Sequence, residues 1–554
     1  MTPAPAKHPP KSSVKETLTQ IAIAFAMAFV FRGFVIEAFL IPTGSMAPTL
    51  NGAHIRNQAP QSGYRWNVNP RDTSGGPNSE PLSLQGAGQK PLEVHDPMTG
   101  ELVRRREVPL AWGDRIFVMK YLYSIYDPAR FDVIVFKSPL DPTINLIKRL
   151  TGLPGDMIAI IDGDIFARHA SPGDEKAPNT WVLPGWVCQR KPERAQLAMW
   201  QLVFDSRYTP LNPIRDGSTW FRSPWTAGGE DAKAWEIDGR QNYHFGGKGP
   251  AVLEWDSVHH PVTDYYAYDE FAGTPPNANF PVSDLRLSTG FRPESANAAV
   301  SAVVESRGHE FRADISGSKV TLRMRKLAGP APAPGEPGTA APAGEWVTLG
   351  QGELPSPLSP DRVTNLDFWH VDQSLSLYSD GRLIAHGEYN WTPEERIVNT
   401  FGLSMSQVTS NPACFLASGT AYPNPRARFE FSGGAFTLYR TALSRDIHYQ
   451  ANTYHGDGSG NRHIYEGFPA RGTHPASPCN LSPDQFFVCG DNSPLSYDAR
   501  LWDKPSPWVA PMDPNVGVVN RDLLIGKAFF VYFPAPYREY GVPIPDFGDM
   551  RFIW

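Results

Sequence analysis

The stretch Asn145-Leu-Ile-Lys-Arg-Leu-Thr-Gly-Leu-Pro-Gly-Asp-Met-Ile-Ala-Ile-Ile-Asp-Gly-Asp164 decides the fold of this part of the chain. Two apolar runs flank Leu-Pro-Gly, and the second run ends in Asp162-Gly163, a dipeptide typical of tight hairpin turns. The pattern therefore predicts a strand, a turn and a second strand that enters a hairpin. β-Branched and aromatic residues over 112–120 and 131–136 predict two further strands before it.

Lys148 and Arg149 are neighbours inside the first apolar run. Successive side chains of a strand point to opposite faces, so one of the two should point toward the interior. A desolvated lysine loses part of its preference for the charged form, and it can then act as a general base near neutral pH. The alternative is an edge-strand lysine in solvent.

Composition sets the outer bounds. A chain of 554 residues is too long for one hydrophobic core, which predicts two or more domains. The net charge of -6 argues against a nucleic-acid binder, because such proteins carry a basic excess. With 55 prolines, 48 glycines and 12% aromatic residues, the fold class is predicted to be mainly β with many turns.

The cysteines and histidines give no metal-binding pattern. The four cysteines have no metal-like spacing, and either disulfides or buried free thiols are compatible with their positions: Cys188, Cys414, Cys479 and Cys489. His259 and His260 would point to opposite faces of a strand. We therefore predict no metal site.

The N-terminal part contains the one long apolar run. Residues 1–16 are predicted to be a tail and residues 17–40 a transmembrane anchor, because roughly 20 apolar residues span a bilayer. Arg32 and Glu37 would then lie at the membrane interface. A cleaved secretory signal is the alternative, but the bulky residues before Pro42 favour an uncleaved anchor. Lysines ahead of the run predict a cytoplasmic tail.

A serine follows directly behind this run, in Ile41-Pro-Thr-Gly-Ser-Met-Ala-Pro-Thr-Leu50. Pro42 and Pro48 stiffen the flanks of Gly44-Ser45-Met46, which predicts a turn that presents one hydroxyl group.

Several segments together resemble bacterial type I signal peptidases, and the resemblance covers roughly residues 17–56, 111–168 and 480–535. The segments occur in the family's order: Thr43–Leu50 behind an anchor, Gly113-Asp114 opening a strand, Ile147–Asp156, Gly490–Trp502 and Leu524–Ala528. The resemblance implies an antiparallel β catalytic domain in two parts, 41–168 and 481–554.

The resemblance also implies a serine–lysine dyad. Ser45 would be the nucleophile and Lys148 its general base. The Ser45 backbone N–H and the Thr43 hydroxyl would form the oxyanion hole. The chemistry needs no cofactor.

The remaining site residues implied by the resemblance support the dyad. Ser496 would hydrogen-bond Lys148, Asp498 would form a salt bridge with Arg500, and Met46 would pack near the dyad; Gly490 begins this supporting loop. The chain departs from the family where Ser493-Pro-Leu replaces the usual Arg-Asp-Asn, where Ala499 replaces a serine, and where Thr43 stands for a common serine.

Between these parts the chain is longer than the resemblance accounts for. We predict a loop insertion over 57–110, an irregular insertion over 169–295 and a linker over 450–480. Regular short strands over 296–449 predict a β-sandwich that resembles concanavalin- or laminin-G-like jelly rolls. A structural insert is the default interpretation, and a module that binds a glycan or a protein partner is the alternative.

These observations favour a membrane-bound serine endopeptidase that removes signal peptides from exported preproteins at the bacterial inner membrane. The catalytic domain would lie on the periplasmic side, with signal peptides and membrane lipid as partners and no nucleic acid. One alternative is a membrane-tethered β-sandwich binding protein with an inactive peptidase domain. Another is a self-cleaving serine–lysine peptidase. The terminal Arg551–Trp554 would lie either in the membrane interface or in the core.

Overall fold

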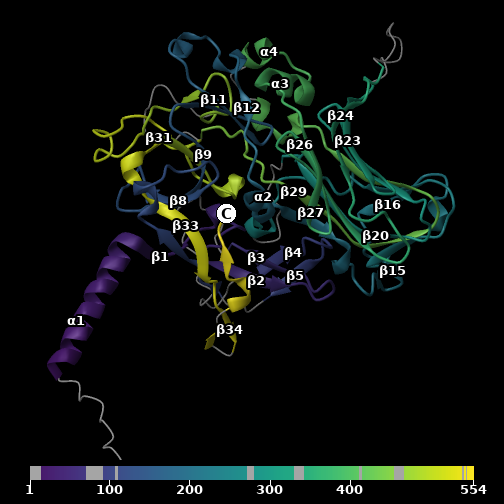
Figure 1. Cartoon of the computed structure of the whole chain (residues 1–554), viewed down its shortest axis with the longest axis horizontal. Helices are drawn as coiled ribbons and strands as arrows, with labels where there is room; N and C mark the ends of the chain where they lie inside the picture. The colour runs from purple at the N-terminus through teal and green to yellow at the C-terminus, as the bar shows by residue number, and fades with distance from the viewer. Residues whose placement is uncertain are drawn as a thin grey trace, which may run out of the picture.

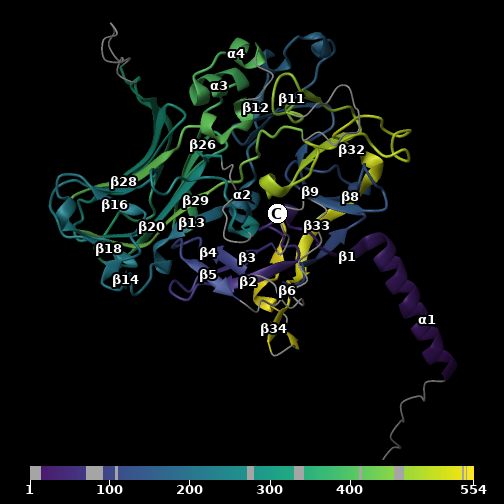
Figure 2. The ribbon, with the colours of Figure 1, turned by 180° about the vertical axis from the view of Figure 1, so that it is seen from behind.

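A computed structural model describes residues 14–69, 92–105, 110–270, 280–329, 342–410, 415–454, 467–539, 542–544 and 546–554. The described chain is mainly β, and its strand pairs are antiparallel. One apolar helix projects from a body of β-sheets, and the two sheets built from residues 201–445 lie on the side of the body away from that helix (Figures 1 and 2). The mainly β fold class is confirmed.

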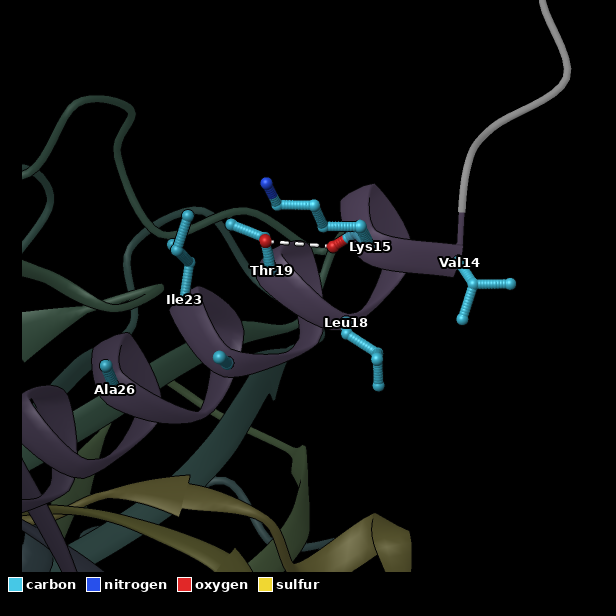
Figure 3. Close-up of a pocket in the computed structure, with 7 residues that line it drawn as sticks. Val14, Lys15, Leu18, Thr19, Ile23 and Ala26 are labelled. Carbon is cyan, nitrogen blue, oxygen red and sulfur yellow. Dashed lines mark hydrogen bonds between the residues drawn. The ribbon is translucent and has the colours of Figure 1, made fainter.

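The N-terminal helix consists of α1 (Val14–Val30) and a π-helical turn, η1 (Phe31–Val35). Together they form 22 residues with a mean hydropathy of 1.8, long and apolar enough to cross a membrane. None of the helix is buried, and its apolar side chains project outward (Figure 3). The Thr19 hydroxyl donates to the Lys15 carbonyl oxygen at 2.9 Å, so its polar group is satisfied within the helix as a lipid environment requires.

The boundaries of the predicted anchor need correction. Residues 36–40 form strand β1 (Ile36–Leu40) rather than helix, and β1 pairs with β7 (Arg115–Met119). The β-branched Val35-Ile36 pair favours extended backbone, and the edge of β7 supplies hydrogen-bond partners. Of the predicted tail, residues 1–13 lie outside the described residues, and residues 14–16 already belong to α1.

The first sheet combines both ends of the chain. Its strand order is β1-β7-β33-β8-β9-β31-β32, with β36 beside β33. The further strands are β8 (Val133–Lys137), β9 (Asn145–Gly152), β31 (Gln485–Cys489), β32 (Val519–Asn520), β33 (Leu524–Phe533) and β36 (Arg551–Phe552). Strands from residues 36–152 therefore alternate with strands from residues 485–552, and neither part completes the sheet alone.

The last residues divide between core and solvent. Ile553 is buried in the same cluster as Met46, Ile116 and Val531. Phe552 and Trp554 are exposed. The core interpretation of Arg551–Trp554 therefore holds for Ile553, whereas the two aromatic rings stay outside the core.

The second sheet has the order β12-β11-β10-β30. The predicted hairpin joins β10 (Asp156–Ile161) to β11 (Asp164–His169), with Asp162 and Gly163 both at positive φ. Two short strands complete the sheet, β12 (Val187–Cys188) and β30 (Cys479–Asn480). Cys188, Cys479 and Cys489 are buried free thiols, and Cys414 lies outside the described residues.

The predicted loop over 57–110 contains strands in its described part. They are β2 (His54–Gln58), β3 (Arg65–Val68), β4 (Leu92–His95), β5 (Leu102–Arg105) and β6 (Leu110–Ala111). Ile55, Trp66, Val68 and Val94 share a small core. Each of these strands has at most two apolar residues, which is too few to show a period in the sequence. Residues 70–91 and 106–109 lie outside the described part.

Two large sheets form the predicted β-sandwich around the largest hydrophobic cluster. One sheet has the order β17-β18-β29-β20-β25-β26-β27, with β13 beside β29, and the other has the order β16-β19-β28-β21-β22-β23-β24. Strands within the predicted range are β21 (Ala299–Ser306), β22 (His309–Ser316), β23 (Lys319–Lys326), β24 (Val347–Glu353), β25 (Thr364–Val371), β26 (Ser374–Ser379), β27 (Arg382–Glu388), β28 (Arg426–Ser432) and β29 (Phe436–Arg445).

The predicted range 296–449 is too short for this sandwich. Strands of both sheets come from the region predicted to be irregular: β13 (Gln201–Asp205), β16 (Trp225–Gly228), β17 (Trp235–Glu236), β18 (Asn242–Phe245), β19 (Ala251–Trp255) and β20 (Leu285–Pro293). Most of these strands are two to five residues long and are separated by turns, so tertiary pairing rather than local pattern defines them. In the predicted linker 450–480, residues 455–466 lie outside the described residues.

Candidate active site

Ser45 lies in the 3-10 turn η2 (Gly44–Met46), between β1 and β2. The Ala47 N–H donates to the Gly44 carbonyl oxygen at 2.9 Å, which closes the turn. Met46 is fully buried beneath the turn, while Thr43 and Ser45 are half-buried. The chain thus anchors the turn through Met46 and leaves the serine hydroxyl partly accessible.

Lys148 reaches this serine from the middle of the first sheet. It lies on β9 opposite Ile134 of β8, and its side chain is buried, with 3% of the residue exposed. Lys148 Nζ donates to Ser45 Oγ at 2.5 Å. The structure therefore brings together the two residues that were predicted to form the dyad.

Burial lowers the pKa of Lys148 to about 8. The carboxylates of Asp498 and Asp491 act in the opposite direction, and the Arg500 guanidinium lowers the pKa further. Part of the population consequently holds a neutral amine near neutral pH, as a general base requires.

Arg149 is fully buried as well, on the opposite face of β9. Its Nε and Nη2 atoms donate to the two carboxylate oxygens of Asp491 at 2.7 and 2.6 Å. The sequence predicted that one of the two basic residues would point inward, and both do. The bidentate contact with Asp491 compensates for the burial of Arg149.

The loop behind β31 packs directly against the serine turn. A Cβ atom at position 490 would lie 2.2 Å from Ser496 Oγ and 2.5 Å from the Ser45 carbonyl oxygen, so the close approach requires Gly490. The Gly490 N–H donates to Asp498 Oδ2 at 2.9 Å. Asp498 and Arg500 form a fully buried salt bridge of 2.8 Å.

Ser496 does not form the predicted hydrogen bond to Lys148. Its Oγ atom lies against Gly490 and has no hydrogen-bond partner within the described ranges. Arg500 instead donates to the hydroxyl of Ser493 at 2.8 Å, and the Gln450 N–H donates to the same oxygen at 2.8 Å. Ser493, which departs from the family pattern, therefore takes part in the hydrogen bonds that hold this loop.

Thr43 precedes the serine turn in extended conformation and lies next to Gly44 in sequence. Its hydroxyl and the Ser45 backbone N–H belong to the same short segment, as the predicted oxyanion hole requires. Their role as an oxyanion hole stays a prediction.

Asn492 and Asp269 were not predicted as site residues. The Asn492 backbone N–H donates to the Ser45 carbonyl oxygen at 3.1 Å, and its side-chain Nδ2 donates to the Gly44 carbonyl oxygen at 3.2 Å. The same Nδ2 donates to Asp269 Oδ1 at 2.7 Å. Asn492 stood within the Gly490–Trp502 motif, which could have identified it, whereas Asp269 lies outside every matching segment and has no sequence signal.

Two clusters of buried acidic and thiol groups lie outside this site: Asp164, Cys188 and Asp372, and then Asp284, Asp372 and Asp446. The ammonium group of Lys191 already contacts Asp372 at 2.5 Å and Asp446 at 2.7 Å. Charged partners of the protein itself therefore occupy these carboxylates. His259, for which the sequence predicted no metal site, forms a hydrogen bond of 2.7 Å between its Nδ1 atom and Asp256 Oδ2.

Comparison with known proteins shows a similarity to signal peptidases in part of the chain. Residues 107–177 match the family described as signal peptidase, peptidase S26. The chain is 27% identical to signal peptidase I of Rickettsia prowazekii over 155 residues, which cover 28% of this chain and 43% of that protein. It is 35% identical to signal peptidase I of Pseudomonas aeruginosa over 133 residues, which cover 24% of this chain and 30% of that protein.

The resemblance to signal peptidase I is thus confirmed for the matched residues. These matches span less than half the length of each of the two relatives. The apolar helix near the N-terminus fits a membrane-anchored protein.

Solved structures similar to the chain include the carbohydrate-binding module CBM66 from Bacillus subtilis, with a TM-score of 0.20, 9% identity and coverage of 40% of this chain and 94% of that chain. The laminarinase from Rhodothermus marinus has a TM-score of 0.24 and 10% identity, over 45% of this chain and 98% of that chain.

Proposed function

We propose that this protein is a membrane-anchored serine endopeptidase that cleaves signal peptides from exported preproteins with a Ser45/Lys148 dyad. The observation that carries the proposal is the 2.5 Å hydrogen bond between the buried Lys148 Nζ and Ser45 Oγ. A nucleophile and a base in direct hydrogen-bond contact meet the first geometric requirement of covalent acyl transfer. The similarity to signal peptidase I supports this substrate class.

In the proposed reaction, neutral Lys148 accepts the Ser45 hydroxyl proton as Oγ attacks the scissile carbonyl carbon. The resulting oxyanion would accept hydrogen bonds from the Ser45 N–H and the Thr43 hydroxyl. Lys148 then gives its proton to the leaving amine as the peptide C–N bond breaks. A water molecule then loses a proton to Lys148 as it attacks the acyl carbon, and Lys148 returns this proton to Ser45 Oγ as the acyl C–O bond breaks, which restores both groups.

The proposed location is the bacterial inner membrane, with the helix of residues 14–35 as the anchor and the body on the periplasmic side. Membrane lipid and signal peptides are the proposed partners. Ser45 follows the anchor by ten residues in sequence, and β1 occupies the first five of these, so the proposed nucleophile is tethered close to its membrane segment. A cleavage site that follows an apolar signal segment would emerge at a similar height.

A reconstituted cleavage assay tests the proposal. The full chain in lipid vesicles is given a precursor with small residues before its cleavage site, alongside Ser45→Ala and Lys148→Met. Each variant should lower the rate by roughly 10³-fold or more, because removing one member of a catalytic unit removes its whole effect. The exposed Ser124→Ala and Lys137→Met are matched controls and should retain activity. An inactive parent chain or an active Ser45→Ala variant would contradict the proposal.

A further inference from the structure

Residues 264–270, here called the 264–270 segment, connect the inserted sandwich to the site. The segment lies between β19 and β20 and contains the 3-10 turn η9 (Ala267–Asp269). Tyr266, Tyr268 and Asp269 are all buried. This part of the chain lies outside the segments that resemble signal peptidases.

Three residues of the 264–270 segment contact either Gly44 of the serine turn or the loop that supports this turn. The Tyr268 ring packs against Gly44, where a Cβ atom would lie 2.3 Å from Cε1 of the ring. The Tyr266 hydroxyl donates to the Asp491 carbonyl oxygen at 2.9 Å. Asp269 Oδ1 accepts the Asn492 Nδ2 hydrogen bond of 2.7 Å.

The Asn492 amide is the link between Asp269 and the serine turn. Its nitrogen donates to both Asp269 and the Gly44 carbonyl oxygen, whereas its oxygen has no hydrogen-bond partner in the part of the chain that the structure describes. The two hydrogen bonds made by Nδ2 therefore determine the orientation of the Asn492 amide group. If the amide rotated by half a turn, its oxygen would face the Gly44 carbonyl oxygen, and two acceptors would repel each other.

Asp269 determines which orientation is favoured, because only an acceptor can face the second N–H of Asn492. Burial raises the pKa of Asp269 to about 7, with Asp264 acting in the same direction and the hydrogen bond from Asn492 and the Arg445 guanidinium opposing it. A carboxyl oxygen accepts a hydrogen bond in either protonation state, so a neutral amide at position 269 can take its place.

We propose that Asp269 is a positioning residue of the peptidase site: through the Asn492 amide, it holds the Gly44–Ser45 turn where Ser45 Oγ meets Lys148. This inference rests on the proposed function of the site. It assigns the inserted sandwich a task in the reaction, since the 264–270 segment is anchored between two of its strands.

The test compares two variants. Asp269→Asn keeps a hydrogen-bond acceptor, whereas Asp269→Leu keeps the approximate side-chain volume but removes the acceptor. In the cleavage assay, kcat of Asp269→Leu should fall by about 10-fold or more while KM stays within about twofold, as expected for misplaced reacting groups. Asp269→Asn should retain kcat within about threefold. The control Tyr265→Phe removes a hydrogen bond to Glu270 within the same segment and should change neither constant.

A second measurement does not depend on activity. Amide hydrogen exchange of peptides covering residues 43–50 should become faster in Asp269→Leu and remain unchanged in Asp269→Asn and Tyr265→Phe. Equal exchange and equal kcat in the parent chain and Asp269→Leu would overturn the inference. If Asp269→Leu does not fold, Asp269→Ala replaces it with the same expected results. An inactive parent chain that nevertheless shows the exchange difference would contradict the proposed function alone.

Discussion

At the scale of single residues, opposing electrostatic effects act on Lys148. Burial favours the neutral amine, while Asp498 and Asp491 favour the charged form. Each of these carboxylates is itself paired with a buried guanidinium, Asp498 with Arg500 and Asp491 with Arg149. Because the pairs largely cancel their own charges, desolvation prevails, and the pKa of Lys148 lies below its ordinary value.

The rate of cleavage should therefore depend on pH through Lys148. The unprotonated amine is the active form, so kcat/KM should rise with pH through an apparent pKa of about 8 and level off above it. The measurement is kcat/KM of a precursor peptide between pH 6 and 10, with circular dichroism as a control for folding. A midpoint near the ordinary lysine value of 10.5 would contradict the assignment.

The contact between Ser45 and Lys148 could be predicted from the sequence because both residues stand in short motifs with a fixed order. Ser496 was assigned a hydrogen bond to Lys148 that it does not make, and Arg500 contacts the hydroxyl of Ser493 at the position where the chain departs from the family pattern. Asp269 could not be predicted. It comes next to Asn492 only through the folding of the inserted sandwich, which no local pattern encodes.

At the scale of elements, the junction between helix and sheet is short. The π-helical turn Phe31–Val35 ends directly at β1, which forms one edge of the first sheet. Lys120 Nζ also forms an ion pair with Glu37 Oε2 of β1 at 3.1 Å, so a side-chain contact adds to the backbone pairing of β1 with β7. One hydrogen bond, from the Lys120 N–H to the Val35 carbonyl oxygen at 3.1 Å, also joins the last residue of the helical segment to this part of the chain.

Two truncations should separate anchoring from folding. A chain that starts at Ile36 should lose membrane association and keep its melting temperature, because α1 buries no residue against the body. A chain that starts at Ile41 also loses β1, exposes the edge of β7 and should melt at a lower temperature. Vesicle flotation and thermal unfolding measure the two effects. Equal melting temperatures for the two truncations would contradict the role of β1.

Sequence patterns predicted strands well where side chains alternate over six or more residues, as in β21, β22 and β23. They failed at β1, where the largely apolar sequence on both sides of Val35 gave no sign that helix changes to strand. They also failed at β16 and β18, which are only four residues long. In those strands, pairing with distant partners supplies the stabilisation that local preference does not.

At the scale of the whole molecule, buried ion pairs join the second sheet to the sandwich. Asp162 in the β10–β11 turn contacts Arg307 at 2.5 Å, and Arg307 also contacts Asp284 at 2.6 Å. Asp164 contacts Arg396 of helix α3 (Pro393–Phe401) at 2.7 Å. All of these side chains are buried. The two parts should therefore unfold together.

Arg307→Met should destabilise the protein by about 3–5 kcal/mol, because it leaves the buried Asp284 carboxylate without its guanidinium partner, whereas Arg396 still contacts Asp162 at 3.1 Å. The matched control Arg323→Met breaks a partly exposed pair with Asp314 within the sandwich and should cost about 1 kcal/mol or less. Urea unfolding measures the loss of stability in each variant, and calorimetry of the parent chain shows whether it unfolds in one transition. Two separate transitions in the parent chain would contradict a single cooperative unit.

The arrangement of the first sheet has a consequence for biosynthesis. Gly44 and its partner Asn492 are separated by 448 positions, so the serine turn leaves the ribosome long before the loop that supports it. At a synthesis rate of about 5–20 residues per second, this delay lasts roughly 20–90 s. During that interval the nascent chain already carries its apolar helix, whereas the loop that supports the serine turn has not yet been made. Under the proposed function, the chain would be unable to cut its own emerging N-terminal segment, or a neighbouring chain, until its synthesis is nearly complete.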